Sequence, residues 1–185
     1  MIVKHHHTTA EALFEQPSDG YRYELVEGEL RQMAPAGETH GRTIQPIAAY
    51  LYLYVRSNQL GATYGAETGF ILARDPDTVL APDVAFVTTA RLDAMRVERG
   101  FAPGAPDMVV EVVSPGDSAN EVEEKVLLWL DSGTRMVIVV RPRSRTVTVY
   151  RSRQEIRILS ETDVLTGGDV VPGWELPVSQ VFEQT

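Results

Sequence analysis

Apolar positions along the chain recur with two periods, one typical of strands and one typical of helices. Apolar residues at helical spacing predict two long helices, over 41–59 and 118–131, and a short helix over 8–16. Short apolar or alternating runs predict strands at 62–73, 82–89, 107–114, 134–142, 146–150 and 155–160. After residue 160 the pattern indicates a loop, a brief strand and a terminal helical turn.

The order of these elements predicts the fold class. Alternation around Glu27 and Gly28 indicates an N-terminal β-hairpin with strands at about 21–26 and 29–34. The chain then continues through a helix, three strands, a helix, a strand and a C-terminal hairpin, which predicts an α/β fold with a mixed β-sheet and helices on its faces. The run at 107–114 is apolar almost throughout, as in a strand that is covered on both faces.

Length and composition limit the kind of protein. With 185 residues, of which 43% are hydrophobic, the chain suits one globular domain over 1–185. It has no run of eighteen apolar residues and no apolar stretch of signal-peptide type near its N-terminus, so we expect neither a membrane span nor secretion, and a cytoplasmic location. Because Cys is absent, a metal would need oxygen or His ligands. The tract His5, His6 and His7 is either a weak metal site or an incidental terminus.

The charge of the chain bears on its partners. A formal net charge of -9 would repel a polyanion, so binding to nucleic acid cannot be argued from bulk charge. Positive charge is concentrated in the segment 141–157, which contains six arginines. Two interpretations of this segment stay open: a charged hairpin edge that opposes strand pairing, or a surface that contacts phosphates.

Glu111 interrupts the apolar run at 107–114, and a buried carboxylate is costly unless it is paired or bound to a cation. Asp107 shares its strand face but lies four residues away, or roughly 13 Å, which is too far for two carboxylates to hold one magnesium ion. Asp83 follows Pro82 at the start of another predicted strand. A carboxylate on a neighbouring strand lies within about 5 Å, so Asp83 is the better partner.

Lys125 is the third irregular position. It lies in or beside the apolar stripe formed by Val122, Val126 and Trp129 of the second long helix. Of 17 basic side chains only Lys4 and Lys125 are lysine, which favours a site that needs a compact ammonium group. The alternative is a lysine that reaches solvent from the edge of the stripe.

Four segments resemble a known family. The segments are YELVEGEL at 23–30, PDVAF at 82–86, PDMVVEVVSP at 106–115 and KVLLWLDSGTRMVIVVRP at 125–142. They are similar to the Uma-type restriction endonuclease family, long labelled a domain of unknown function, within the PD-(D/E)XK nuclease superfamily. The resemblance runs from about Ala10 to Phe182. It implies a restriction-endonuclease-like core of helix, three strands, helix and strand, and a metal-dependent endonuclease that hydrolyses the phosphodiester bonds of nucleic acid.

The resemblance also implies site residues. Asp83 and Glu111 match the two acidic positions, which are catalytic and would hold Mg²⁺ or Mn²⁺. The lysine expected two residues after Glu111 falls on Val113, and Lys125 resembles the migrated lysine of this family. An acidic ligand from the first helix of the core is missing in 41–59, and its candidate replacements are Glu24, Glu67 and His40. DNA is the expected substrate.

Two other interpretations stay open. A catalytically inactive relative would keep the fold as a module that binds nucleic acid or protein, or Glu111 would be neutralised by an arginine such as Arg135 or Arg141 without any metal. A homodimer is a further hypothesis, because Tyr50, Tyr52 and Tyr54 of the first long helix point to different sides and cannot all be core.

Overall fold

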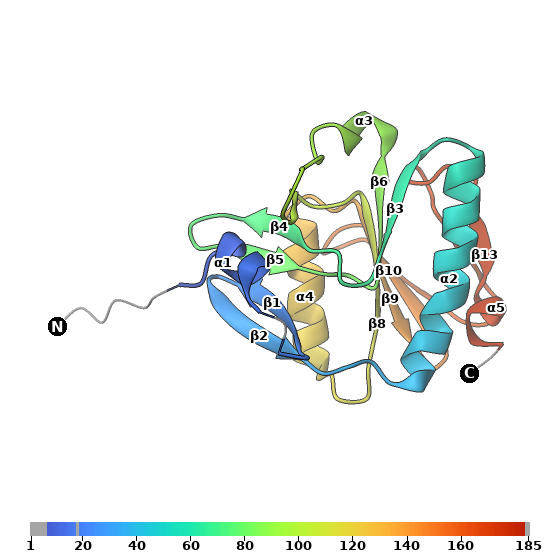
Figure 1. The fold of residues 1–185 in the computed structure, drawn as a ribbon. Coiled ribbons are helices and arrows are strands. Elements are labelled where there is room, and N and C mark those ends of the chain that lie inside the picture. The colour runs from blue at the N-terminus through green and yellow to red at the C-terminus, as the bar shows by residue number, and fades with distance from the viewer. Residues whose placement is uncertain (1–6, 18, 184–185) are drawn as a thin grey trace.

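A six-stranded sheet lies at the centre of the structure, a computed structural model that describes residues 7–17 and 19–183 (Figure 1). Its strand order is β11-β10-β9-β8-β6-β3, in which β8 and β9 run parallel and the other neighbours antiparallel. The strands are β3 (Gly61–Gly65), β6 (Val84–Thr88), β8 (Met108–Val112), β9 (Met136–Arg141), β10 (Thr146–Tyr150) and β11 (Ile156–Leu159).

A second sheet is built from the N-terminal part of the chain. Its strand order is β2-β1-β5-β4-β7. The strands are β1 (Arg22–Val26), β2 (Glu29–Met33), β4 (Phe70–Ala73), β5 (Thr78–Leu80) and β7 (Ala102–Pro103). A small hairpin, β12 (Val164–Thr166) with β13 (Glu175–Pro177), forms a two-stranded sheet of its own.

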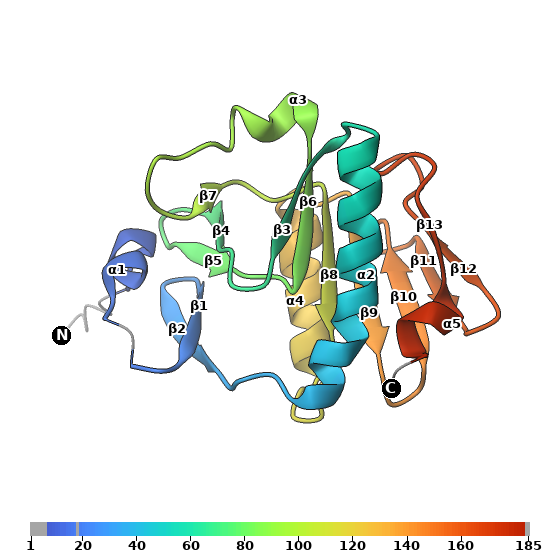
Figure 2. The same cartoon turned by 45° about the vertical axis from the view of Figure 1, so that its right-hand side comes forward.

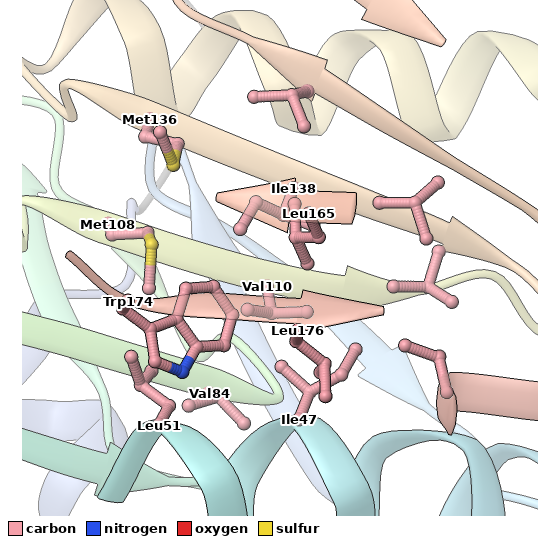
Figure 3. Close-up of a cluster of buried hydrophobic side chains, with 14 of the residues drawn as sticks. Ile47, Leu51, Val84, Met108, Val110, Met136, Ile138, Leu165, Trp174 and Leu176 are labelled. Carbon is pink, nitrogen blue, oxygen red and sulfur yellow. The ribbon is translucent and has the colours of Figure 1, made fainter. Parts of the chain in front are cut away.

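The helices form layers around and between these sheets (Figure 2). On one face of the six-stranded sheet lie α2 (Glu38–Ser57), α5 (Val178–Phe182) and the small hairpin, which share one hydrophobic cluster. Figure 3 shows part of it, with Ile47 and Leu51 of α2 pointing toward the strands. On the other face, α4 (Ala119–Asp131) packs in a second cluster to which both sheets contribute. The short helix α1 (Ala10–Glu15) covers the outer face of the second sheet, and α3 (Thr89–Leu92) follows β6.

Strand alternation decides which side chains of β8 meet α4. Val110 and Val112 belong to the cluster beneath α2, whereas Val109 belongs to the cluster around α4. Because successive side chains of a strand point to opposite faces, Glu111 shares the face of Val109 and points toward α4. The same rule applies to the residue before β6, since Ala85 packs on the α4 side and Asp83 has its parity.

Local signals fix the place of α4. Ser118 and Glu121 form a capping box at its N-terminus, where each side chain accepts a hydrogen bond from the other residue's backbone N–H. Gly133 follows the helix with φ 99°, a left-handed conformation that favours glycine. The helix α4 connects the parallel strands β8 and β9 and therefore packs back on the sheet. Its apolar stripe lies on the face that carries Glu111.

The structure confirms the mixed α/β class and corrects four details. The predicted strand at 62–73 is two strands in different sheets, β3 and β4, joined by a turn in which Glu67 has φ 73°. Glu67 is therefore not on a strand. The helix predicted over 41–59 begins at Glu38, so it contains His40 and one acidic residue, Glu38, which pairs with Arg42. The sequence pattern did not predict β5, β7 and α3, or the division into two main sheets.

Three further expectations concern the termini and surface. His5 and His6 lie outside the described residues, and His7 is exposed. Tyr50 and Tyr52 are about half exposed on α2, whereas Tyr54 donates a hydrogen bond to the carbonyl of Pro172. Self-association through this helix stays a prediction. Within residues 7–17 and 19–183 no helix is long and apolar enough to span a membrane.

Candidate functional site

Five titratable side chains are linked by close contacts near the start of β6 and the end of β8. Both α2 and α4 begin at the lower end in Figure 2. We call the five side chains the charged cluster. Its members come from five different parts of the fold: Glu24 from β1, His40 from α2, Asp83 before β6, Glu111 from β8 and Lys125 from α4. The contacts between them define what the site can do.

Asp83 is held by the neighbouring strand. The register of β6 and β8 pairs Val84 with Val110, and its continuation places Asp83 opposite Glu111. The backbone N–H of Asp83 donates to the carbonyl of Val110 at 3.1 Å, and its Oδ2 accepts from the N–H of Val112 at 2.7 Å. The carboxylate of Asp83 thus lies at the end of β8, and it is close enough to Glu111 for its charge to help raise the pKa of Glu111.

Two residues of α4 bind Glu111. The Trp129 indole Nε1–H donates to its Oε1 at 2.8 Å, and the Lys125 ammonium lies 3.1 Å from its Oε2. Lys125 and Trp129 are four residues apart and therefore lie on the same face of the helix. Each oxygen of the buried carboxylate thus has its own donor.

Lys125 also binds the second sheet. Its Nζ lies 2.9 Å from Oε1 of Glu24, the same oxygen that accepts the backbone N–H of Ala81 at 2.9 Å. Glu24 points toward α4 because alternation along β1 sends Leu25 to the α1 side and Val26 to the α4 side. Val113, where the resemblance led us to expect a lysine, is partly buried against the α4 cluster. The ammonium therefore reaches Glu111 from the helix.

His40 contacts Asp83 from the other side of the sheet end. Its Nε2 lies 3.1 Å from Oδ2 of Asp83, and its side chain is 11% exposed. This hydrogen bond is the main cause of a raised pKa of His40, which burial opposes and the negative charge of Asp83 reinforces. His40 is thus a cation at the edge of the cluster over a wider pH range than a solvated histidine.

The remaining acidic candidates lie elsewhere. Glu67 pairs with Arg22 on the surface and does not join the cluster. Asp107 accepts hydrogen bonds from the backbone and side chain of Thr88 and pairs with Arg91. Arg135 binds Asp107 and Asp169, and Arg141 donates to Thr148. The interpretation in which Arg135 or Arg141 neutralises Glu111 is therefore wrong, since the cation beside Glu111 is Lys125.

The charge balance of the cluster leaves negative charge in excess. Burial raises the pKa of Glu111 to about 7, the nearby charge of Lys125 opposes this rise, and the carboxylates of Asp83 and Glu24 reinforce it. Burial alone would lower the pKa of Lys125, but Glu111 and Glu24 outweigh burial and raise it. Lys125 is therefore a permanent cation, and above the pKa of Glu111 three carboxylates face one ammonium and one histidine.

This excess charge and the donor atoms fit a hard divalent cation. Magnesium binds oxygen ligands and commonly takes one or two carboxylates, with water and phosphate oxygens completing its shell. Asp83 and Glu111 supply such a pair, and a cation beside them would offset both the burial and the carboxylate repulsion that raise the Glu111 pKa. In the part of the chain that the structure describes, no group of three or more His, Cys, Asp or Glu side chains is arranged to hold a metal. A bound cation would thus depend on two carboxylates and on water or substrate.

The arginine-rich segment forms no continuous free cationic surface. Arg145 binds Glu161, Arg151 binds Asp169, and Arg153 binds Asp131. These ion pairs neutralise much of the charge that the sequence concentrates there. They favour the interpretation of a charged hairpin surface over that of a dedicated phosphate-binding face.

Two contacts in the site could not be read from residue types alone. The sequence pattern predicts Trp129 as a member of the apolar stripe, and in the structure its indole N–H also donates to Glu111. The signal was its spacing of four from Lys125, which places both side chains on one helix face. Glu24 was considered as a metal ligand, whereas in the structure it binds the ammonium of Lys125.

Comparisons with known proteins give a family and a fold. The family Uma2, whose description reads "Putative restriction endonuclease", matches residues 10–179. No curated protein matches the chain. A crystal structure described as a putative nuclease belonging to DUF820, from Anabaena variabilis, is similar with a TM-score of 0.80 and 22% sequence identity, over 95% of this chain and 97% of that chain. At this identity the likeness shows the fold alone.

The raised pKa of Glu111 predicts how stability changes with pH in the absence of metal. Between about pH 5 and pH 7 an unfolded glutamate is ionised while Glu111 in the folded protein still binds its proton, so unfolding becomes easier as pH rises. The raised pKa of His40 acts in the same direction, because its stabilising charge is lost as pH rises through its folded pKa. We expect the free energy of unfolding to fall by about 1–3 kcal/mol over this range.

Denaturant unfolding at several pH values, with a metal chelator present, measures this slope. Glu111→Gln should flatten most of it, because glutamine has no proton to lose, and His40→Gln should remove a smaller part. Glu67→Gln is the matched control, since Glu67 lies outside the charged cluster. A slope that is the same in Glu111→Gln and in the wild-type protein would contradict the prediction.

Proposed function

The chain belongs to the Uma2 family, and on this premise we propose that it is a Mg²⁺- or Mn²⁺-dependent nuclease that hydrolyses phosphodiester bonds of nucleic acid, with DNA as its substrate. The observation that carries the proposal is the contact of Lys125 with Glu111, whose strand β8 also binds the backbone and the carboxylate of Asp83. A carboxylate pair with one fixed ammonium at its side matches the needs of phosphodiester hydrolysis, which are cation binding and stabilisation of new negative charge.

Each side chain has a separate part in the proposed reaction. Asp83 and Glu111 would hold the cation, which when bound would neutralise charge and lower the pKa of a water molecule. Lys125 is a point charge that contacts a phosphate oxygen or orients the attacking water. His40 keeps the carboxylate of Asp83 in place through its 3.1 Å contact, and Glu24 keeps Lys125 in place at 2.9 Å.

A bound cation would also reduce the electrostatic repulsion between the site and a phosphate diester. The chain carries a net charge of -9, and the site itself has three carboxylates, so a phosphate diester would be repelled from it. A divalent cation held by Asp83 and Glu111 would make the local potential less negative. Cation binding and substrate binding should therefore be coupled.

A non-catalytic module with the same fold is the second candidate. One observation favours it: among the described residues no three-ligand group is arranged to hold a metal. In such a module the pairing of Lys125 with Glu24 and Glu111 would only connect the two sheets. The two candidates differ in whether the protein binds Mg²⁺ and cleaves nucleic acid.

The first test is stabilisation by metal. A cation that binds only the folded protein adds about 1.4 kcal/mol of stability at ten times its Kd, so Mg²⁺ or Mn²⁺ should raise the melting temperature in a concentration-dependent way. Asp83→Asn and Glu111→Gln should each abolish this rise. Asp107→Asn is unsuitable as a control because Asp107 is a buried ion-pair partner, whereas Glu67→Gln should respond to metal as the wild-type protein does.

Calorimetric titration gives the decisive result. If neither cation binds up to tens of millimolar, the module replaces the nuclease as the better proposal. If binding occurs, a cleavage assay on mixed DNA and RNA substrates, with the double variant Asp83→Asn/Glu111→Gln beside it, identifies the substrate. Cleavage of RNA alone would contradict the choice of DNA.

The second test concerns Lys125. Lys125→Met keeps most of the side-chain volume and removes the charge, so the rate of cleavage should fall by about two orders of magnitude. The metal-free protein should lose about 3–5 kcal/mol of stability, because Glu24 and Glu111 would be left as buried carboxylates without their cation. Metal at Glu111 should restore part of this loss.

Arg31→Met is the matched control for Lys125→Met. Arg31 also joins the N-terminal hairpin to α4, through an exposed ion pair with Glu124, and such pairs are worth about 0–1 kcal/mol. It should leave the cleavage rate unchanged. A Lys125→Met protein that cleaves at the wild-type rate would remove Lys125 from the mechanism.

The third test separates the two roles considered for Glu24. If Glu24 serves to hold Lys125, then Glu24→Gln should lower the cleavage rate about tenfold and change Mg²⁺ affinity little. The glutamine carbonyl can still accept hydrogen bonds from the N–H of Ala81 and from the ammonium of Lys125. As a metal ligand, the same change should weaken Mg²⁺ binding as strongly as Glu111→Gln. Thermal shift and kinetics measured on one preparation tell these outcomes apart.

A further inference from the structure

Trp129 is a buried group that the proposed reaction does not use. Its side chain has no exposed surface and packs in the cluster around α4. Its ring meets Phe70 of the second sheet edge-on, with ring centroids 6.4 Å apart and an interplanar angle of 73°. The ring is therefore fixed by neighbours from another layer of the fold.

The polar end of this ring points at the charged cluster. The Trp129 Nε1–H donates to Oε1 of Glu111 at 2.8 Å, while Oε2 faces Lys125 at 3.1 Å. A hydrogen bond to a carboxylate is stronger and more directional than one to a neutral acceptor. One oxygen of Glu111 is thereby tied to a rigid donor that water cannot replace without opening the core.

The second tryptophan shows that the fold does not require such a bond. Trp174 is also buried, in the cluster beneath α2, and its Nε1 has no hydrogen-bond partner among the described residues. The chain contains two tryptophans in all. One indole N–H is bonded to the proposed metal ligand Glu111, and the other, on the opposite side of the sheet, has no hydrogen-bond partner among the described residues. Trp174 can therefore serve as a control for Trp129.

We propose that Trp129 is a positioning residue that sets the affinity of the site for divalent cations. The inference rests on the proposed function, because it assumes that Glu111 is a ligand. By holding Oε1, the indole fixes the plane of the carboxylate before any cation arrives, so that binding costs no reorientation of the side chain. Partners that orient ligands in this way typically change metal affinity 10–100-fold when they are removed.

Trp129→Phe tests this directly. Phenylalanine keeps an aromatic ring against Phe70 and loses the N–H, so Mg²⁺ affinity, read from thermal shift as a function of MgCl₂, should weaken about tenfold or more. Trp174→Phe removes an indole N–H that has no partner and should keep the wild-type affinity. Both variants exchange one buried tryptophan for phenylalanine, so a general loss of packing would affect both.

Fluorescence provides a readout that does not depend on the folding of Trp129→Phe. In the Trp174→Phe protein all tryptophan emission comes from Trp129, and MgCl₂ should change it with the same midpoint as the thermal shift, because the carboxylate that accepts its N–H binds the cation. In Trp129→Phe the remaining emission comes from Trp174 and should not respond to MgCl₂.

The possible results separate this inference from the proposed function. If the wild-type protein binds no Mg²⁺, both fail together. If the wild-type protein binds Mg²⁺ but folded Trp129→Phe binds it equally tightly, the positioning role fails and the nuclease proposal stands. An emission of Trp129 that ignores saturating MgCl₂ would also overturn the inference, whatever the stability of the variants.

Discussion

The structure depends on one largely buried ion bridge, in which the ammonium of Lys125, itself partly exposed, lies between the carboxylates of Glu24 and Glu111. A carboxylate inside a Val-rich strand is tolerated only with a cation nearby, and a lysine beneath two sheets only with anions nearby. Each group therefore requires the others. Because Glu24 belongs to one sheet, Glu111 to the other and Lys125 to the helix between them, the same bridge connects three layers of the fold.

This constraint places chemistry and stability in the same residues. The apolar cluster around α4 contains Trp129, which packs on Phe70 and also holds Glu111. The apolar side of α4 packs in this cluster and so sets the rotation of the helix about its axis. That rotation in turn places Lys125 and the indole N–H of Trp129 at Glu111. In the proposed function, the cost of burying carboxylates close together is the source of the site's affinity for a cation, since burial and the neighbouring carboxylates together raise the Glu111 pKa and a divalent ion offsets both.

Sequence alone predicted the parts of this site that follow from periodicity. The apolar run at 107–114 identified Glu111 as a carboxylate that needs a partner, and helical spacing placed Lys125 in or beside the stripe that contains Trp129, since both patterns act over a few residues. Glu24 was harder to assign, because its contact with Lys125 depends on how two sheets stack and on a separation of a hundred residues along the chain. His40 was placed outside the helix because α2 begins at a glycine cap without a side-chain hydrogen bond, so no residue marks the start.

Exposure within the charged cluster indicates from which side a substrate would reach it. The side chains of Lys125 and Asp83 are 21% and 18% exposed, whereas that of Glu24 is 7% exposed. Oε1 of Glu24 already accepts the N–H of Ala81 and faces Lys125, so Glu24 is the least accessible of these three side chains. In the proposed reaction the phosphate therefore approaches along Asp83 and Lys125. Glu24 and Trp129 remain beneath it as the groups that hold the ammonium and the second carboxylate.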